Sequence, residues 1–257
     1  MNAACDLAGR GVLVTRPAGQ AAGLCALIAA AGGRPIRFPA LEIAPVADPT
    51  PARTLLAKRW DLLVFVSRNA VEQALAITAG NGTWPGANRL AAVGRSTACA
   101  LTEAGRPPDL VPSERFDSES LLALPGLADL GGRRVLIVRG EGGRALLGEA
   151  LAERGASVHY AQVYRRMRPD LDPADLLDRW PGEVQLVTAT SDEVLLNLES
   201  ILGEGGRQLL QSTPLVVISE RGAATARRLG FQRVRAAERA SDDAIVEALC
   251  AMVSETQ

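Results

Sequence analysis

The stretch Ser157–Arg168, SVHYAQVYRRMR, reads as a β-strand that runs past the end of its own sheet. In an extended chain alternate side chains face opposite sides, so Tyr160 and Tyr164 would share one side while Val163 faces the other. Pro169 follows the stretch and biases the residue before it away from helix. We therefore expect this segment to leave its sheet as a connector between two lobes, with Tyr164 lying between them.

The composition of the 257-residue chain limits its functional class. Hydrophobic residues make up 47% of the chain and charged residues 22%, which is enough to bury one large core or two smaller ones. The net charge of −1 argues against a protein that binds nucleic acid or a membrane surface, because both would require a basic excess. No apolar run is long enough to span a bilayer and the N-terminal residues lack the pattern of an export signal, so we expect a cytoplasmic protein.

Several common kinds of site are missing from the sequence. The four cysteines have neither CxxC spacing nor a dense framework, and we interpret them as reduced thiols: Cys5, Cys25, Cys99 and Cys250. His159 is the only histidine and falls in mid-strand, where a structural role is commoner than a catalytic one, so neither a transition-metal site nor a Ser-His-Asp triad is expected. The chain contains no GxGxxG after a strand and no GxxxxGK[ST], which argues against a nucleotide cofactor.

Apolar runs of strand length alternate with helical patterns along the whole chain, which predicts an α/β fold. The expected strands of the first half are Val12–Thr15, Pro35–Phe38, Leu62–Val66, Leu90–Val93 and Asp109–Val111. Those of the second half are Arg134–Val138, Ser157–Tyr164, Val184–Ala189, Leu215–Ile218 and Val234–Ala236. Pro39–Pro51 contains four prolines and is expected to be a linker rather than a helix.

The two halves of the chain share a pattern. The residues that recur 123 positions apart are Arg16 with Arg139, Gly32 with Gly155, and Ser67 with Thr190. After a drift of two positions, Gly94 pairs with Ser219 and Gly105 with Gly230. A duplicated α/β unit is the simplest explanation, and chance similarity between any two strand-helix units is the alternative.

The residues just after each strand are the ones that meet ligands in open parallel sheets, which bind beyond the carboxyl ends of their strands. Here they are Thr15-Arg16, Ser67-Arg68-Asn69, Gly94-Arg95-Ser96-Thr97, Arg139-Gly140, Thr190-Ser191 and Ser219-Glu220-Arg221. Free backbone N–H groups and the helix dipole at such positions favour carboxylate or phosphate. Ser, Thr, Asn and Gly are also simply good helix caps, so any one of these positions has a structural alternative. Together they predict a two-lobed protein that binds an anionic small molecule.

Six motifs carry a resemblance to a known family. They are VLVTRP at 12–17, FVSRNAV at 65–71, AVGRSTA at 92–98, LIVRGEGGR at 136–144, VYRR at 163–166 and SERGAATARRLG at 219–230. In order and spacing they resemble the uroporphyrinogen-III synthases, over nearly the whole chain. The pattern departs from that family at Val66, where threonine is common before the serine, and at Thr190-Ser191-Asp192, which is a looser match.

The resemblance implies two flavodoxin-like parallel-sheet lobes joined by two extended connectors. The first lobe would comprise residues 1–38 and 169–257 and the second residues 39–168, with connectors near 39–45 and 163–169. Both the proline-rich stretch and VYRRMRP follow the second strand of their repeat. Each repeat would therefore exchange its first two strands with the other.

The resemblance also implies an activity, the conversion of hydroxymethylbilane into uroporphyrinogen III with loss of water and inversion of ring D, in tetrapyrrole biosynthesis (haem, sirohaem, cobalamin or chlorophyll). Such a cyclising lyase needs no cofactor or metal. We predict that Tyr164 donates a proton to the departing hydroxyl, because a phenol is protonated at neutral pH. The residues expected to bind the substrate carboxylates are Arg16, Ser67, Asn69, Thr97, Arg139, Gly140, Thr190, Ser191, Ser219 and Arg221.

Two other functional classes fit the same architecture. A two-lobed module that binds or senses an anionic ligand would hold it tightly without turnover. A two-domain glycosyltransferase would need a nucleotide-phosphate site, which the sequence does not offer. A monomer is expected in each case, because the connectors rather than a subunit interface would form the cleft.

Overall fold

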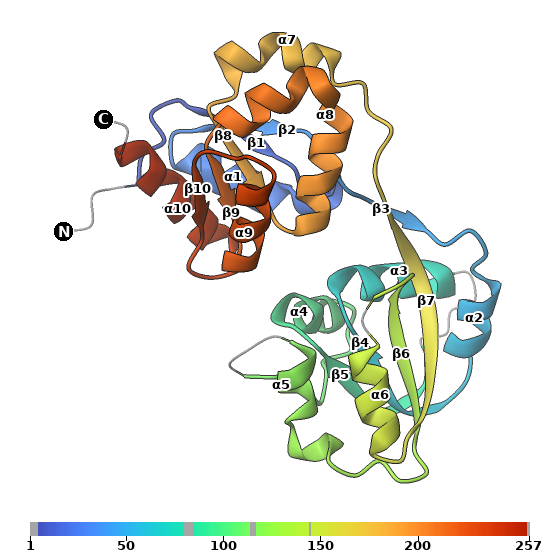
Figure 1. Cartoon of the computed structure of the whole chain (residues 1–257). Coiled ribbons are helices and arrows are strands. Elements are labelled where there is room, and N and C mark those ends of the chain that lie inside the picture. The colour runs from blue at the N-terminus through green and yellow to red at the C-terminus, as the bar shows by residue number, and fades with distance from the viewer. Residues whose placement is uncertain (1–4, 80–84, 114–116, 144, 256–257) are drawn as a thin grey trace. The chain divides into compact units, whose positions relative to one another are not determined.

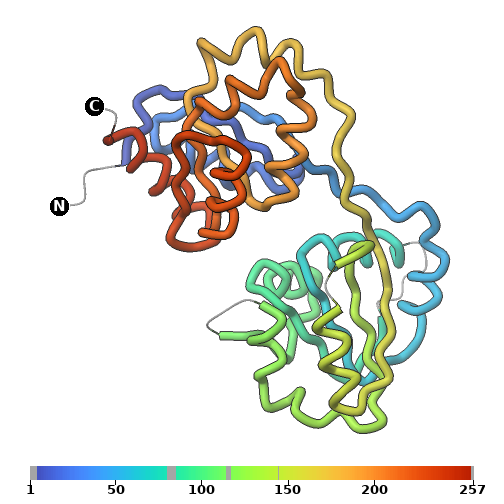
Figure 2. Tube along the Cα trace, in the orientation of Figure 1, coloured from blue at the N-terminus to red at the C-terminus, as the bar shows by residue number. Residues whose placement is uncertain are grey.

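The structure, a computed structural model, describes residues 5–79, 85–113, 117–143 and 145–255. The chain forms two compact units: unit 1 is Met1–Glu42 with Met167–Gln257, and unit 2 is Ile43–Arg166. The trace passes from unit 1 into unit 2 in blue and returns in yellow (Figure 2). Within the described part of the chain, no helix combines the length and apolar character that a membrane span requires.

Unit 1 contains a five-stranded sheet in the order β10-β9-β8-β1-β2 (Figure 1). The strands are β1 (Gly11–Val14), β2 (Arg34–Arg37), β8 (Leu186–Ala189), β9 (Leu215–Val217) and β10 (Val234–Ala236). β1 pairs in parallel with β2 and β8, and β9 pairs in parallel with β8 and β10. Counted within the unit this is the order 2-1-3-4-5, one of the common orders of doubly wound α/β sheets.

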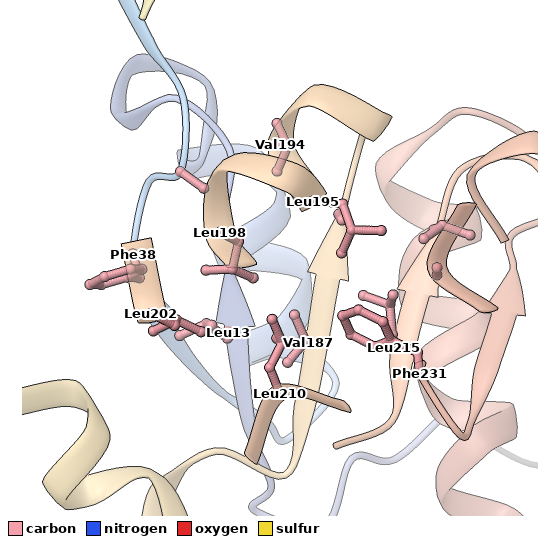
Figure 3. Close-up of a cluster of buried hydrophobic side chains, with 14 of the residues drawn as sticks. Leu13, Phe38, Val187, Val194, Leu195, Leu198, Leu202, Leu210, Leu215 and Phe231 are labelled. Carbon is pink, nitrogen blue, oxygen red and sulfur yellow. The ribbon is translucent and has the colours of Figure 1, made fainter. Parts of the chain in front are cut away.

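Helices cover both faces of the sheet in unit 1. They are the 3₁₀ turn η1 (Ala18–Gln20), α1 (Ala22–Ala30), α7 (Ala174–Glu183), α8 (Asp192–Ser212), α9 (Glu220–Arg228) and α10 (Asp242–Ser254). Leu13 packs in one buried cluster and its neighbours Val12 and Val14 in another, as the alternation of a strand between two helical layers requires. Figure 3 shows the first cluster, in which Leu198 and Leu202 of α8 gather with side chains of the strands.

Unit 2 has the same layered construction around a sheet in the order β3-β7-β6-β4-β5. Its strands are β3 (Glu42–Pro45), β4 (Trp60–Phe65), β5 (Ala87–Ala92), β6 (Arg134–Gly140) and β7 (Ser157–Met167). Its helices are α2 (Thr50–Leu56), α3 (Arg68–Thr78), α4 (Arg95–Glu103), α5 (Ser118–Leu122), the 3₁₀ turn η3 (Pro125–Leu127) and α6 (Leu146–Glu153). Leu63 and Phe65 of β4 pack into one buried cluster, and Leu62 and Val64 into the other.

Each of the two sheets contains strands from both sequence repeats. β1 and β2 of the first repeat lie in one sheet with β8, β9 and β10 of the second, whereas β6 and β7 lie with β3, β4 and β5. Each sheet therefore combines the first two strands of one repeat with later strands of the other. The α/β class with two sheets of mainly parallel strands is confirmed.

The proline-rich segment is more ordered than the linker that we expected. It contains β3 and the start of α2, which begins at Thr50 with Pro51 in its first turn. Proline is tolerated there because the first helical N–H groups have no intrahelical partner. The Asp48 side chain accepts a hydrogen bond from Thr50 N at 2.9 Å, and its hydrogen bonds to Thr50 lower the pKa of that carboxyl.

Two other expectations about secondary structure were only partly right. The strand expected at Asp109–Val111 is reduced to a single parallel bridge between Leu110 and Ala91. The helix marked by Val194 and its neighbours extends to Ser212 as α8, with a break at Gly203, whose φ of 61° suits glycine.

The predicted alternation of side chains along β7 was wrong near its end. β6 pairs Arg139 with Gln162 but Gly140 with Tyr164, a register shift that leaves one extra residue on β7. Such a bulge re-aims the side chains beyond it. As a result Val163 and Tyr164, which we expected on opposite sides, belong to the same buried cluster.

The expectation of four reduced thiols was also wrong for one pair. Cys5 and Cys250 form a disulfide with a Cα–Cα distance of 5.5 Å, while Cys25 is a buried thiol and Cys99 an exposed one. The two cysteines are separated by 245 positions, so no local spacing could have revealed the pair. Cys250 lies on α10, and the bond ties that helix to the N-terminal segment of unit 1.

Candidate functional site

A pocket of about 390 Å³ opens in unit 2. The residues that line it are Val66, Ser67, Ser118, Ile137, Arg139, Gly140, Gly142, Gly143, Leu147, Gly148, Tyr160, Tyr164 and Arg166. Several of them follow or end β4, β6 and β7, so the pocket lies at the carboxyl ends of parallel strands. This is the edge at which doubly wound sheets bind ligands.

Tyr164 is buried, with 6% of its surface exposed, and its side chain lines the pocket. Its hydroxyl lies 3.1 Å from Ser67 Oγ, a hydrogen bond in which either oxygen can be the donor. Its carbonyl accepts a hydrogen bond from Glu141 N at 2.8 Å, which holds the end of β7 against β6. The phenol is therefore fixed at a polar edge of an otherwise apolar cluster.

Ser67 is the N-cap of α3. Its backbone is extended, with φ −159° and ψ 161°, and its Oγ accepts a hydrogen bond from Ala70 N at 3.1 Å. The cap satisfies one of the free N–H groups of the first turn and lies where the helix dipole is positive. The N-terminus of α3 thus faces the pocket through a hydroxyl.

The arginine that follows this cap is already engaged. Arg68 Nε donates to Glu72 Oε1 at 2.8 Å, and Arg68 Nη2 donates to Glu103 Oε2 at 2.7 Å. These hydrogen bonds, first to Glu72 and then to Glu103, raise the pKa of the Arg68 guanidinium above its ordinary value. Arg68 therefore ties α3 to α4.

Asn69 and Thr97 occupy first turns at the same edge of the sheet. Asn69 is half-buried in α3, and Thr97 is 2% exposed in α4, whose N-cap is Gly94. Among the described residues that line the pocket, neither is present. The structure thus brings Ser67, Arg139 and Tyr164 together but leaves these two predicted residues beside the pocket.

Arg139 holds a glycine-rich loop. Its guanidinium donates to the carbonyls of Gly140 at 3.4 Å, Gly142, and Gly143 at 3.4 Å, and lies 4.9 Å from the centre of the Tyr160 ring. Gly142 and Gly143 have φ values of 70° and 95°, which favour glycine. Arg139 thus organises the loop after β6; Arg144, the last residue of the LIVRGEGGR motif, lies outside the described residues.

The predicted site residues of unit 1 also follow parallel strands. Ser191 caps α8 through Val194 N at 3.1 Å, Ser219 caps α9 through Gly222 N at 3.2 Å, and Thr190 follows β8 directly. The two arginines have acidic partners. Arg16 lies 2.6 Å from an Asp242 carboxylate oxygen, and Arg221, which is 71% exposed, lies 3.5 Å from one of Asp192.

Several residues of the pocket were not predicted from the sequence, chief among them Tyr160. It is 39% exposed, and a Cβ on Gly148 would come within 1.8 Å of its hydroxyl, so the glycine on α6 makes room for it. Ser118, at the start of α5, and Arg166, on β7, were missed as well. Tyr160 could have been found, because the chain has only two tyrosines and both fall in Ser157–Arg168.

The described residues that line the pocket include no histidine, cysteine, aspartate or glutamate. In the ranges that the structure describes, no group of three or more His, Cys, Asp or Glu side chains is placed to bind an ion. The pocket instead offers hydroxyls, the guanidinium groups of Arg139 and Arg166, and the N-terminus of a helix.

Comparison with known proteins finds one family. A family profile described as Uroporphyrinogen-III synthase HemD matches residues 23–247. The chain is 37% identical to uroporphyrinogen-III synthase of Escherichia coli K12 and 38% identical to that of Salmonella typhimurium LT2, each over 93% of this chain and 99% of the relative. A putative uroporphyrinogen-III synthase of Methanothermobacter thermautotrophicus is 34% identical over 84% of the chain and 87% of its own length.

Two solved structures share the fold. A uroporphyrinogen-III synthase mutant of Thermus thermophilus has a TM-score of 0.57 at 23% identity, covering 96% of this chain and 97% of that one. A uroporphyrinogen-III synthetase of Helicobacter pylori 26695 has a TM-score of 0.61 at 16% identity, covering 96% and 100%. At these identities the structures support the architecture alone.

Proposed function

The chain belongs to the uroporphyrinogen-III synthase family, and we propose that it catalyses the cyclisation of hydroxymethylbilane to uroporphyrinogen III with loss of water and inversion of ring D. The observation that carries this proposal is sequence similarity over almost the whole chain: a relative named uroporphyrinogen-III synthase matches 93% of the chain at 37% identity. The phenol of Tyr164 in the pocket of unit 2 supports the proposal, because the reaction needs a proton donor.

The proposed reaction begins with one proton transfer. The Tyr164 hydroxyl gives its proton to the departing hydroxyl oxygen, the carbon–oxygen bond breaks, and its electron pair leaves with water. The lone pair of the pyrrole nitrogen stabilises the methylene carbon that has lost the hydroxyl group. This gives an azafulvene-type electrophile, and Tyr164 is left as a phenolate. After ring closure through a spiro intermediate, the proton lost on rearomatisation restores the phenol, so water is the only by-product.

Binding of the substrate carboxylates falls to the strand ends of both units. The helices capped by Ser67, Ser191 and Ser219 place first-turn N–H groups at those ends, where carboxylate is favoured. The other residues that we propose for this role are Arg16, Asn69, Thr97, Arg139, Gly140, Thr190 and Arg221. Each contact would contribute on the order of 1 kcal/mol. Holding the chain of pyrroles in one geometry favours the inverted closure over the spontaneous one.

We also propose that the enzyme acts as a monomer without a cofactor, because one chain supplies every group named above. Sedimentation of the active protein at assay concentration tests the first point. Full activity of protein dialysed against a chelator tests the second.

The direct test is incubation with freshly prepared hydroxymethylbilane, followed by separation of uroporphyrinogen isomers I and III. We expect isomer III with the protein and isomer I without it. Tight binding of the tetrapyrrole with isomer I as the only product would support an anion-binding module instead. The proposed function would then be abandoned.

Tyr164→Phe tests the proton donor. We expect formation of isomer III to fall by about 10²-fold or more with the fold retained, because general acid catalysis contributes on that scale. The matched control is Tyr160→Phe, which removes the second phenol of the same pocket and should cost much less. Circular dichroism checks the fold, and unchanged turnover in Tyr164→Phe would remove Tyr164 from the mechanism.

A further inference from the structure

The hydroxyls of Ser67 and Tyr164 form a pair whose direction determines what Tyr164 can do. The two oxygens are 3.1 Å apart, and each carries one proton. If Tyr164 donates to Ser67, its proton is directed away from the pocket. If Ser67 donates to Tyr164, the phenolic proton is free to point at a ligand.

The cap geometry of Ser67 favours the second arrangement. Ser67 Oγ already accepts the N–H of Ala70 at 3.1 Å at the positive end of α3. A hydroxyl whose oxygen accepts a hydrogen bond becomes a better donor and a poorer acceptor, because bonds in a chain polarise one another. The remaining proton of Ser67 is therefore best placed on Tyr164 Oη.

Gly140 leaves the space that the Tyr164 ring occupies when this bond forms. The residue is buried opposite Tyr164 in the β6–β7 register. A Cβ at this position would lie 2.6 Å from Cε2 and 2.7 Å from Cζ of the Tyr164 ring. Real Cβ atoms do not approach so closely, so only glycine lets the ring occupy its present place.

We propose that Ser67 is a positioning residue: its capped hydroxyl donates to Tyr164 Oη and so turns the phenolic proton toward the pocket. The direction of the bond is a property of the folded chain alone. Its consequence for catalysis rests on the proposed function, since it matters only if Tyr164 protonates the leaving hydroxyl. When the phenol loses its proton, the same bond stabilises the phenolate that remains.

Three substitutions at Ser67 separate its role as a helix cap from its role as a hydrogen-bond donor to Tyr164. Ser67→Thr keeps both, Ser67→Asp keeps the cap but has no proton to donate, and Ser67→Ala loses both. We expect kcat to fall about tenfold in the Asp and Ala variants and to stay within about twofold in the Thr variant, the scale of one hydrogen bond. Helix α3 should be weakened in the Ala variant only.

A spectroscopic readout gives the direction without any substrate. Tyr160→Phe leaves Tyr164 as the only tyrosine, because the chain has two. The intensity ratio of the tyrosine Fermi doublet in the Raman spectrum is high when the phenolic oxygen accepts a hydrogen bond and low when the hydroxyl donates one. In this background we expect the acceptor ratio with native Ser67 and in Ser67→Thr, and the donor ratio in Ser67→Asp.

Ser241→Ala is the matched control. Ser241 caps α10 through Ala244 N at 3.4 Å in unit 1, so its loss removes a helix cap of the same kind. We expect this variant to lower stability as Ser67→Ala does, without changing kcat or the Raman ratio. A loss of kcat in Ser241→Ala equal to that in Ser67→Ala would reduce the role of Ser67 to capping.

The outcomes distinguish this inference from the proposed function. A donor ratio for Tyr164 beside native Ser67, or kcat values equal in the Asp and Thr variants, would overturn the role of Ser67 even if isomer III is formed. If the native protein forms no isomer III, the proposed function fails, and the Raman ratio still decides which hydroxyl donates.

Discussion

Units 1 and 2 carry the same pattern of residues after their strands, yet only unit 2 joins such a residue to a phenol. Ser67 and Ser191 both cap a helix from an extended backbone and both accept an N–H at 3.1 Å. Ser67 also meets Tyr164, which is one of the two tyrosines of the chain, both in unit 2. A serine before the helix thus gives the same cap in both units, and only the tertiary structure brings one of these serines to a phenol.

The arginines that we propose for substrate binding also differ between the two units. In unit 1, Arg16 and Arg221 face the carboxylates of Asp242 and Asp192. In unit 2, Arg139 donates to loop carbonyls and lies over the face of the Tyr160 ring. A ligand carboxylate in unit 1 would therefore have to compete with Asp242 and Asp192 for these two guanidinium groups.

The largest expected difference between the units comes from the disulfide. Cys5–Cys250 closes a loop over a separation of 245 residues, and a link over such a loop stabilises by about 5 kcal/mol through chain entropy. In Cys250→Ser we expect segments of unit 1, α10 above all, to lose protection from hydrogen exchange while β4 and β6 of unit 2 keep theirs.

Cys99→Ser is the control for this experiment, because it removes an exposed thiol outside the disulfide. Equal loss of protection in both units would show that the disulfide does not act on unit 1 alone. No loss in α10 would show that the disulfide does not stabilise that helix. Native protein treated with a reductant should behave like Cys250→Ser.

A smaller difference is expected between two close-packed glycines. A Cβ on Gly11 in unit 1 would lie 1.6 Å from the backbone oxygen of Glu183, whereas one on Gly148 in unit 2 would meet the hydroxyl of Tyr160 at 1.8 Å. Backbone cannot move aside, but a partly exposed side chain can. We expect Gly11→Ala to destabilise by about 3 kcal/mol and Gly148→Ala by less than about 1 kcal/mol, as measured by denaturant unfolding. Equal losses would contradict the distinction.

The smallest expected effect tests the pairing of Arg16. In Asp242→Asn the guanidinium loses a carboxylate at 2.6 Å, in a pair whose side chains are 16% and 30% exposed, and stability should fall by about 1 kcal/mol. Because Arg16 then becomes available to a substrate carboxylate, we expect KM to fall a few-fold with kcat unchanged. Asp243→Asn, at the exposed neighbouring position, is the control. A raised KM would show that Asp242 holds Arg16 in its binding geometry.

Much of this architecture could be read from periodicity. The apolar run at Leu62–Val66 became β4 at Trp60–Phe65, and the glycines Gly32, Gly105, Gly155 and Gly230 all adopt positive φ near helix ends. The repeat was aligned one residue short at one point, since the counterpart of the cap Ser67 is Ser191 rather than Thr190. Hydroxyl residues stand side by side there, and only the backbone angles show which of them caps.

Local pattern by itself determined the α/β class, the repeated order of strands and helices, and the polar residues at the strand ends, because these depend on near neighbours in the chain. Tertiary structure alone decided the bulge that buries Tyr164, its bond to Ser67 across 97 positions, the acidic partners of Arg16 and Arg221, and the disulfide. Each of these joins groups far apart in sequence, and the free energy of such contacts depends on where the folded backbone brings them together.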